Sequence, residues 1–193
     1  AGGNALRLGL DTFGEGPIGF SFPVFRSPIT DIKVCSNGYL TTGADGSDFT
    51  NDPCLDPTDP NSAMFVLWDD WSPNISGEVH YLTTGSPGSR IFTAQWTDVP
   101  RFGAASLTAT FQARLHECCG AIEYCYASLV GVPEAPNITT IGVEDETGLE
   151  GACISDQDID EGVCWQILPV VQQPVYCPCR FLDFETEDDF TTP

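Results

Sequence analysis

The chain has 193 residues, of which 41% are hydrophobic and 11% aromatic, so it can bury a domain-sized core and is not intrinsically disordered. Its 28 acidic side chains against 7 basic ones leave a net charge of −21, which repels nucleic-acid phosphates and anionic lipids and favours cations or basic surfaces as partners. No apolar run approaches the roughly 20 residues of a membrane-spanning helix, so the sequence predicts no nucleic-acid binding and no membrane span.

The N-terminal part of the chain is predicted to form strands. Residues 1–12 make an arm in which Leu6, Leu8 and Leu10 alternate with other residues, as on a strand with one apolar face. Phenylalanine and valine alternate in the same way over residues 20–24. We therefore expect a strand-like arm followed by the first strand of the domain.

A hairpin and a long loop follow. The runs 32–35 and 39–42 flank Ser-Asn-Gly, whose glycine suits a tight turn. Residues 43–61 then contain five aspartates and three prolines, and a loop of that length in a compact domain is usually functional or held by a staple or an ion. The run 63–68 is continuously apolar and predicts a fully buried strand.

The remaining runs also have strand character, and no segment keeps a helical period with capping residues. Further strands are expected over 78–82, 90–97, 107–115, 121–129 and 139–143. This pattern predicts an all-β fold, an antiparallel β-sandwich of jelly-roll or immunoglobulin-like packing over residues 13–170. An arm over 171–193, rich in cysteine, proline and acidic residues, ends the chain.

Seven short motifs occur in an order that resembles the nidogen-type extracellular domain and its bacterial surface-protein relatives. They are GFSFPVF (19–25), VCSNGYL (34–40), LWDD (67–70), FTAQW (92–96), TFQARL (110–115), IEY (122–124) and IGVE (141–144). The resemblance covers roughly residues 18–148 and implies a β-sandwich of secreted, often multimodular proteins, with no catalytic residues to carry over. Extra cysteines in this chain depart from the family's pattern.

The sequence gives little evidence for a catalytic site. A nucleophilic triad needs a base, and the two histidines, His80 and His116, lie in a strand and beside a hairpin turn. No Gly-x-Ser-x-Gly motif occurs, and no carboxylate pair stands out among the acids as a glycosidase site. The sequence therefore predicts a protein that is not an enzyme.

Calcium is the better chemical hypothesis, because Ca²⁺ takes six to eight hard oxygen ligands. Two acidic loops offer them, and the candidate ligands are Asp45, Asp48, Asp52, Asp156, Asp158 and Asp160. The alternative is that these aspartates form Asx turns and solubilising charge. Asp69 and Asp70 follow the buried strand, where they are expected to cap it.

The cysteines indicate an oxidising, extracellular or cell-surface location. Cys35 with Cys54 would pin the first acidic loop, and Cys153 with Cys164 would close the second. The remaining five are Cys118, Cys119, Cys125, Cys177 and Cys179. Cys177 and Cys179 are expected to reach back to the hairpin at 118–125, and the odd cysteine is either free or paired between chains.

Asn74 and Asn137 lie in Asn-x-Ser/Thr triplets and are candidate N-glycosylation sites, although such triplets also arise by chance.

The arms separate two hypotheses about function. In the first, the protein is a structural subunit of an extracellular, pilus-like filament or matrix, a homopolymer built by inserting a strand into the neighbouring subunit. The candidate inserting residues are Leu6, Leu8 and Leu10, and secondly Phe181, Leu182 and Phe184. Pairing of each arm within its own sandwich is the alternative for the arms. The second hypothesis is a calcium-assisted adhesin or lectin-like binding module.

Overall fold

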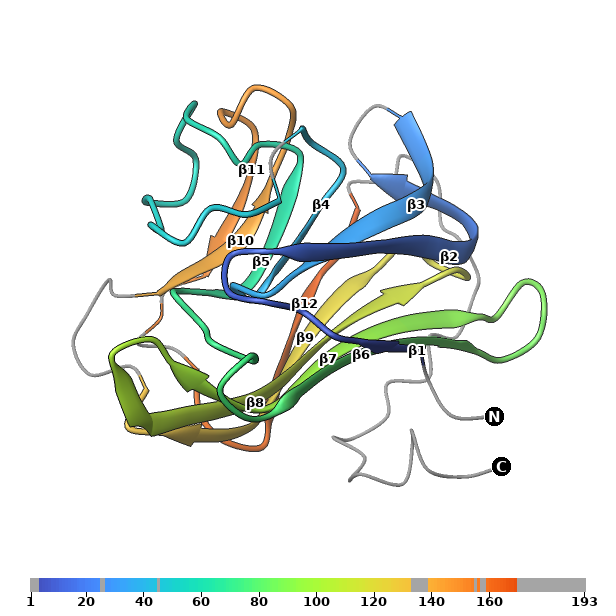
Figure 1. Cartoon of the computed structure of the whole chain (residues 1–193). Coiled ribbons are helices and arrows are strands. Elements are labelled where there is room, and N and C mark those ends of the chain that lie inside the picture. Colours follow the sequence, from blue (N-terminus) through green and yellow to red (C-terminus); the bar gives the residue numbers. More distant parts are fainter. Residues whose placement is uncertain are drawn as a thin grey trace.

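The structure is a computed structural model that describes residues 4–24, 27–44, 46–132, 139–154, 156 and 159–169. Within these ranges it has twelve β-strands and no helix. The strands form two six-stranded antiparallel sheets that pack against each other (Figure 1). The predicted antiparallel β-sandwich is therefore confirmed.

The first sheet has the strand order β1-β6-β7-β8-β9-β12. Its strands are β1 (Asn4–Leu6), β6 (Glu78–Thr84), β7 (Ile91–Arg101), β8 (Ala104–His116), β9 (Ile122–Val130) and β12 (Val163–Ile167).

The second sheet has the order β11-β10-β5-β4-β3-β2. Its strands are β2 (Phe13–Val24), β3 (Ser27–Cys35), β4 (Tyr39–Thr41), β5 (Ala63–Trp68), β10 (Thr140–Glu144) and β11 (Gly151–Ile154).

Most strands have alternating core-facing and outward-facing residues, as their sequences predict, and β5 is the exception. In β7, for example, Phe92, Ala94 and Trp96 face the core between the sheets. Strand β5 is buried on both faces, as its unbroken apolar sequence predicts. The outward face of β5 packs in a second cluster, because the long loop between β4 and β5 covers it.

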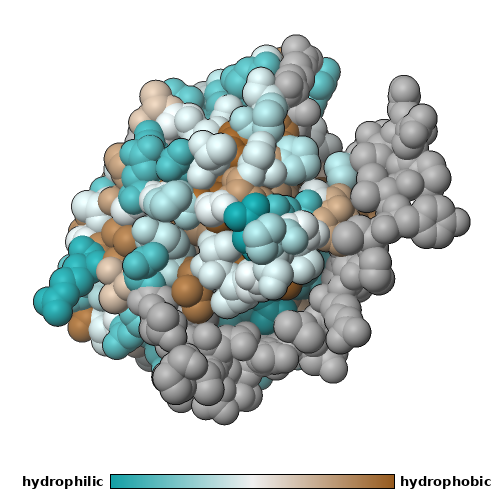
Figure 2. Space-filling view, turned by 90° about the vertical axis from the view of Figure 1, so that its right-hand side faces the viewer, coloured by the Kyte–Doolittle hydropathy of each residue, from teal (hydrophilic) through white to brown (hydrophobic). Residues whose placement is uncertain are grey.

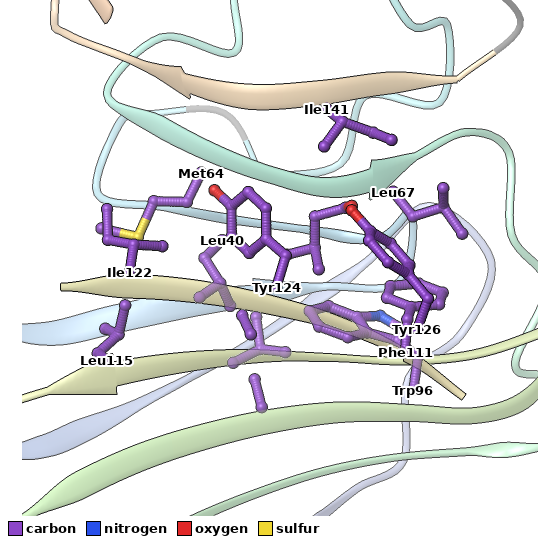
Figure 3. Packing of buried hydrophobic residues seen from close by; sticks show 14 of the residues in the cluster. Leu40, Met64, Leu67, Trp96, Phe111, Leu115, Ile122, Tyr124, Tyr126 and Ile141 are labelled. Atoms are coloured by element: carbon purple, nitrogen blue, oxygen red, sulfur yellow. The ribbon is translucent and has the colours of Figure 1, made fainter. Parts of the chain in front are cut away.

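The two sheets are joined by aromatic packing and by buried hydrogen bonds across the core (Figure 3). Within the first sheet Trp96 stacks on Phe111 with ring centroids 4.9 Å apart, and the Trp96 indole N–H donates across the core to the backbone oxygen of Cys35 on β3 (2.9 Å). The hydroxyls of Tyr124 and Tyr126 on β9 donate to the backbone oxygens of Gly142 (2.7 Å) and Val66 (2.8 Å) on the opposite sheet. Burial raises the pKa of both tyrosines, so they remain donors at all physiological pH values.

The N-terminal arm differs in part from its prediction. Only Asn4–Leu6 form a strand, and this strand pairs with β6 of the same chain. Leu6 and Leu8 both pack against the core, although Leu8 lies outside a strand, and the apolar face predicted for the three leucines is wrong only at Leu10, which is exposed. The structure thus has the arm within its own sandwich.

Both predicted disulfide pairings are wrong. Cys54 is bonded to Cys153, with the Cα atoms 5.9 Å apart, and Cys125 to Cys164 (4.1 Å). Cys153 lies on β11 of the second sheet beside the loop that carries Cys54, whereas Cys164 on β12 of the first sheet is the register partner of Cys125 on β9. The inclusion of Cys35 among the bonded cysteines is also wrong, since this residue lies buried in the second cluster with Tyr39, Phe65 and Trp68.

Several predictions fall partly or wholly outside the described residues. Cys118 and Cys119 are disulfide-bonded, but their expected partners lie beyond the described part of the chain. The other predicted residues outside it are Asp45, Asn137, Asp158, Cys177, Cys179, Phe181, Leu182 and Phe184. No helix within the described ranges is long and apolar enough to cross a membrane.

Candidate functional site

The N-terminal arm lies at one edge of the first sheet. Its register places Asn4 opposite Tyr81, Ala5 opposite His80 and Leu6 opposite Val79. Leu6 occupies space that a side chain at Gly14 of β2 would fill, since a Cβ there would lie 2.6 Å from a Leu6 methyl. The arm therefore depends on a glycine in the other sheet for its close approach.

A groove of about 340 Å³ runs between the arm and β6. It is lined by Leu6 and Leu8 on the arm side and by Pro73, Gly77 and Val79 on the other. Both leucines are partly buried against the main core. The two leucines thus pack on the core and leave a groove open between the arm and β6.

The base of the arm is fixed by the β3–β4 turn. The backbone N–H of Thr12 donates to Ser36 Oγ (3.0 Å), and the Ser36 N–H donates to the Thr12 oxygen (2.8 Å). The Asn37 amide donates to Asp11 Oδ1 (3.1 Å) and to the Asp48 backbone oxygen (3.0 Å). Asp11 has a φ of 49°, so the chain turns sharply where the arm begins.

Asp69 and Asp70 lie next to this base, after β5. Asp69 is buried, accepts the Asp70 backbone N–H (2.8 Å) and forms an ion pair with Arg101 (Nε to Oδ2, 2.8 Å), which agrees with the predicted capping role. The pKa of Asp70 is raised to about 6, first by burial and then by the nearby carboxylates of Asp11 and Asp69, while Arg101 lowers it by less. Three acidic groups therefore share one cation at this point.

Sequence reasoning overlooked Ser36, Asn37 and Arg101. Ser36 and Asn37 are fully buried polar residues, although the sequence reading assigned them only to a turn. Their place in the motif VCSNGYL is the one signal that pointed to them.

The candidate calcium ligands of the first loop make local hydrogen bonds. Asp48 Oδ1 accepts the Thr50 N–H (2.9 Å), and Asp52 Oδ2 accepts the Thr58 hydroxyl (2.9 Å). The Asp48 contact is an Asx turn of the kind expected from the alternative interpretation. Asp160, of the second loop, is exposed.

The structure nevertheless brings the two acidic loops together. Asp52 and Asp156 line one groove of about 450 Å³ beside the Cys54–Cys153 disulfide. Thr139 also lines it, and its buried hydroxyl has no hydrogen-bond partner among the described residues. The backbone N–H of Thr139 donates to the buried Asp156 carboxylate (3.4 Å).

Among the described residues, one group of three potential metal-binding side chains has its ligand atoms within 4.8 Å of one another: Glu123, Cys125 and Cys164. The two cysteines form a disulfide and offer no thiolate, so this group is a poor metal site.

Glu123 instead belongs to a buried polar network on the face of the first sheet that points away from the core. It contacts Arg114 (3.4 Å) and His116 (3.3 Å) and accepts the Gln166 amide on β12 (3.1 Å). Burial by itself would raise the pKa of Glu123, but these bonds and charges lower it below its usual value. The network ties β8, β9 and β12 together.

The other predicted residues lie apart. His80 contacts Glu78 (3.2 Å) at the arm edge. Asn74 is exposed in the turn before β6 and is therefore accessible to modification.

The comparisons with known proteins agree with this architecture. The family described as NIDO related matches residues 6–159, which contain the base of the arm, the first acidic loop and the beginning of the second. No curated protein and no solved structure matched the chain. A disulfide-bonded domain of this kind is consistent with an extracellular location. Because the match covers most of the sequence, the chain belongs to the NIDO-related family.

Proposed function

We propose that the protein is a non-enzymatic structural subunit of an extracellular filament or matrix, in which the N-terminal arm of one subunit pairs with β6 of the next. The observation that carries the proposal is the edge position of β1. This strand holds three residues and is joined to the domain by the segment 7–12, so another subunit can supply the same strand in the same register.

The energetics of the arm support exchange. A short strand at a sheet edge gains little from its own hydrogen bonds, and partial burial of two leucines contributes about 1–2 kcal/mol each. The arm therefore leaves its own β6 at small cost, and the same contacts form again between subunits. Repeated from subunit to subunit, this head-to-tail contact builds an open chain.

The net charge of −21 opposes assembly. We therefore expect assembly to be faster at high ionic strength, where the repulsion between subunits is screened.

Cross-linking tests the proposal directly. Ala5 and His80 are register partners, so the variants Ala5→Cys and His80→Cys place two thiols across the β1–β6 pair. An equal mixture of the two single variants, oxidised after incubation, is expected to give disulfide-linked dimers on a denaturing gel. The double variant is expected to give a covalent ladder after assembly and a cross-linked monomer before it.

Wild-type protein treated identically is the control for the native cysteines. Cross-linked monomers of the double variant, with no dimers from the mixture at any concentration or salt, would contradict arm exchange.

The groove at the Cys54–Cys153 disulfide favours a second function, calcium-assisted binding of a ligand. Asp52, Asp156 and the Thr139 hydroxyl supply oxygens from both acidic loops. Calorimetric titration of calcium into the protein tests this function. Binding that Asp52→Asn abolishes and Asp160→Asn preserves supports it, and an absence of heat with wild-type protein contradicts it.

A further inference from the structure

We infer that the carboxyls of Asp11 and Asp70 form a proton-sensitive clasp at the base of the N-terminal arm, which holds the arm on its own sheet at mildly acidic pH and loosens it as the pH rises. The clasp itself is a property of the monomer. Its role as the control of assembly rests on the proposed function.

The geometry places Asp11 where the arm joins the domain. One of its carboxylate oxygens accepts the Asn37 amide, and the next residue, Thr12, is bonded to Ser36 in both directions. The reciprocal bonds of Thr12 fix the chain from that residue onward, while residues 7–9 are outside any strand. The pivot of a departing arm therefore lies at Thr12, and Asp11 moves away from Asn37 and Asp70 when the arm opens. Figure 1 shows β1 on the side of the sandwich that Figure 2 shows face-on, where hydrophobic patches lie between hydrophilic ones.

Asn37 links Asp11 to the backbone next to Asp70, since its amide N–H donates to Asp11 Oδ1 (3.1 Å) and its amide oxygen accepts the N–H of Trp71 (3.2 Å). The charged groups that face Asp70 are Asp11 from the arm, Asp69 from its own loop and Arg101 from β7. The Arg101 guanidinium is bonded to Asp69. Oxygen Oδ1 of Asp70 is buried and has no hydrogen-bond partner within the described part of the chain. An ionised Asp70 is thus both poorly solvated and repelled by Asp11.

The direction of the pH effect follows from the raised pKa. With the arm closed, the pKa of Asp70 is about 6, against an ordinary value of 3.8. When the arm leaves, the repulsion by Asp11 and part of the burial are lost, so the pKa falls toward the ordinary value. Opening then releases a proton between about pH 4 and pH 6, and it becomes more favourable as the pH rises through this window, by at most about tenfold per pH unit.

Hydrogen exchange of the wild-type protein, kept dilute and monomeric, tests the clasp. We expect the protection factors of the β1 amides to fall at least fivefold between pH 4.5 and 6.5, and by no more than about a hundredfold, since one proton is released over two pH units. The amides of β12, at the opposite edge of the same sheet, serve as an internal reference and are expected to change less.

Two variants isolate the groups involved. Asp70→Asn removes the titrating carboxyl and is expected to leave β1 protected, with less than a twofold change across this range. Asp160→Asn makes the same change in charge at an exposed position before β12 and is expected to keep the wild-type profile. Asp11→Asn is the second variant if Asp70→Asn does not fold, because an asparagine oxygen can still accept the Asn37 amide. It is expected to weaken the pH dependence of the β1 protection factors.

The outcomes separate the clasp from the proposed function. The clasp is overturned if the protection of the β1 amides in the wild-type protein does not change with pH, or if carbon-13 NMR shows that the Asp70 carboxyl titrates near pH 4. Either result overturns it even if the mixed cysteine variants cross-link. A pH-dependent arm that Asp70→Asn fixes, with no cross-linking between chains at any pH, supports the clasp and contradicts arm exchange.

Discussion

The two edges of the first sheet are held in opposite ways. At one edge, β12 pairs with β9 over five residues, the Cys125–Cys164 disulfide crosses this pair, and Gln166 donates to the buried Glu123. At the other edge, β1 pairs with β6 over three residues and is held by two half-buried leucines and the hydrogen bonds at Asp11 and Thr12.

The two edges differ in how many covalent and hydrogen-bonded contacts hold the outermost strand. A cross-strand disulfide keeps β12 at its partner even when the backbone hydrogen bonds open, whereas β1 has no such restraint among the described residues. Native proteins usually protect sheet edges because exposed ones pair with other chains. Here a disulfide crosses one edge, and the other is covered by a strand of three residues, which is the strand that we propose to exchange between subunits.

Breaking the edge that the disulfide crosses has the largest expected effect. Cysteines 125 and 164 are 39 residues apart in sequence, so the double substitution Cys125→Ala/Cys164→Ala is expected to lower the free energy of unfolding by about 3–4 kcal/mol. Urea denaturation measures this loss. Cys35→Ala, at a buried cysteine outside both disulfides, is the control and is expected to lose about 1 kcal/mol. A double variant no less stable than the control would contradict the role assigned to this edge.

Near the Cys54–Cys153 disulfide, pH is expected to act on the global stability of the fold rather than on a local opening of one strand. Glu144, beside the Cys54–Cys153 region, is buried and accepts the Leu55 N–H (3.0 Å). Burial raises its pKa from 4.5 to about 7, and the charges of Asp56 and Asp145 add to this increase against the hydrogen bonds that lower it.

The folded state holds the proton of the Glu144 carboxyl more tightly than the unfolded state does. The contribution of Glu144 to the free energy of unfolding is therefore fully present below pH 4.5 and is lost as the pH rises to about 7. We expect a loss on the order of 2 kcal/mol in the wild-type protein across this range. Glu144→Gln is expected to flatten the profile, whereas Glu15→Gln, at an exposed position of β2, keeps it. Equal slopes in all three proteins would show that Glu144 is not the group responsible.

The sandwich could be predicted from the sequence because the alternation of apolar and polar residues along a strand is a local property. The buried strand at 63–68 and the hairpin around Asn37 are given by residues close together in the chain. Disulfide pairing is not local. The short segments 151–154 and 163–167 did not read as strands, so nothing in the sequence placed Cys153 and Cys164 in different sheets.

The candidate site was predictable only in its parts. The leucines of the arm and the acids of both loops stand out in the sequence, but their partners come from distant strands. Nothing near Asp70 in the sequence indicates that Asp11 lies beside it, and nothing near Asp52 indicates Asp156. These pairs form because the arm crosses from the first sheet into β2 of the second, and because the Cys54–Cys153 disulfide joins two loops.

Substitutions in the arm have the smallest expected effect on stability and the most specific effect on assembly. Leu8→Asp places a charge where a half-buried side chain packs on the core, and Leu10→Asp makes the same change at an exposed position two residues away. We expect Leu8→Asp to lower the free energy of unfolding by about 1 kcal/mol, because only part of the side chain is buried, and Leu10→Asp by less than 0.5 kcal/mol.

Electron microscopy and light scattering at rising concentration then separate a structural role from an assembly role. Leu8 must fill the same gap whether its own chain or a neighbour supplies it, so Leu8→Asp is expected to remain a folded monomer while Leu10→Asp assembles as the wild type does. Filaments that grow normally from Leu8→Asp would mean that this arm does not link subunits. The short edge strand would then be a feature of the monomer alone, and the contact between subunits would have to be sought elsewhere.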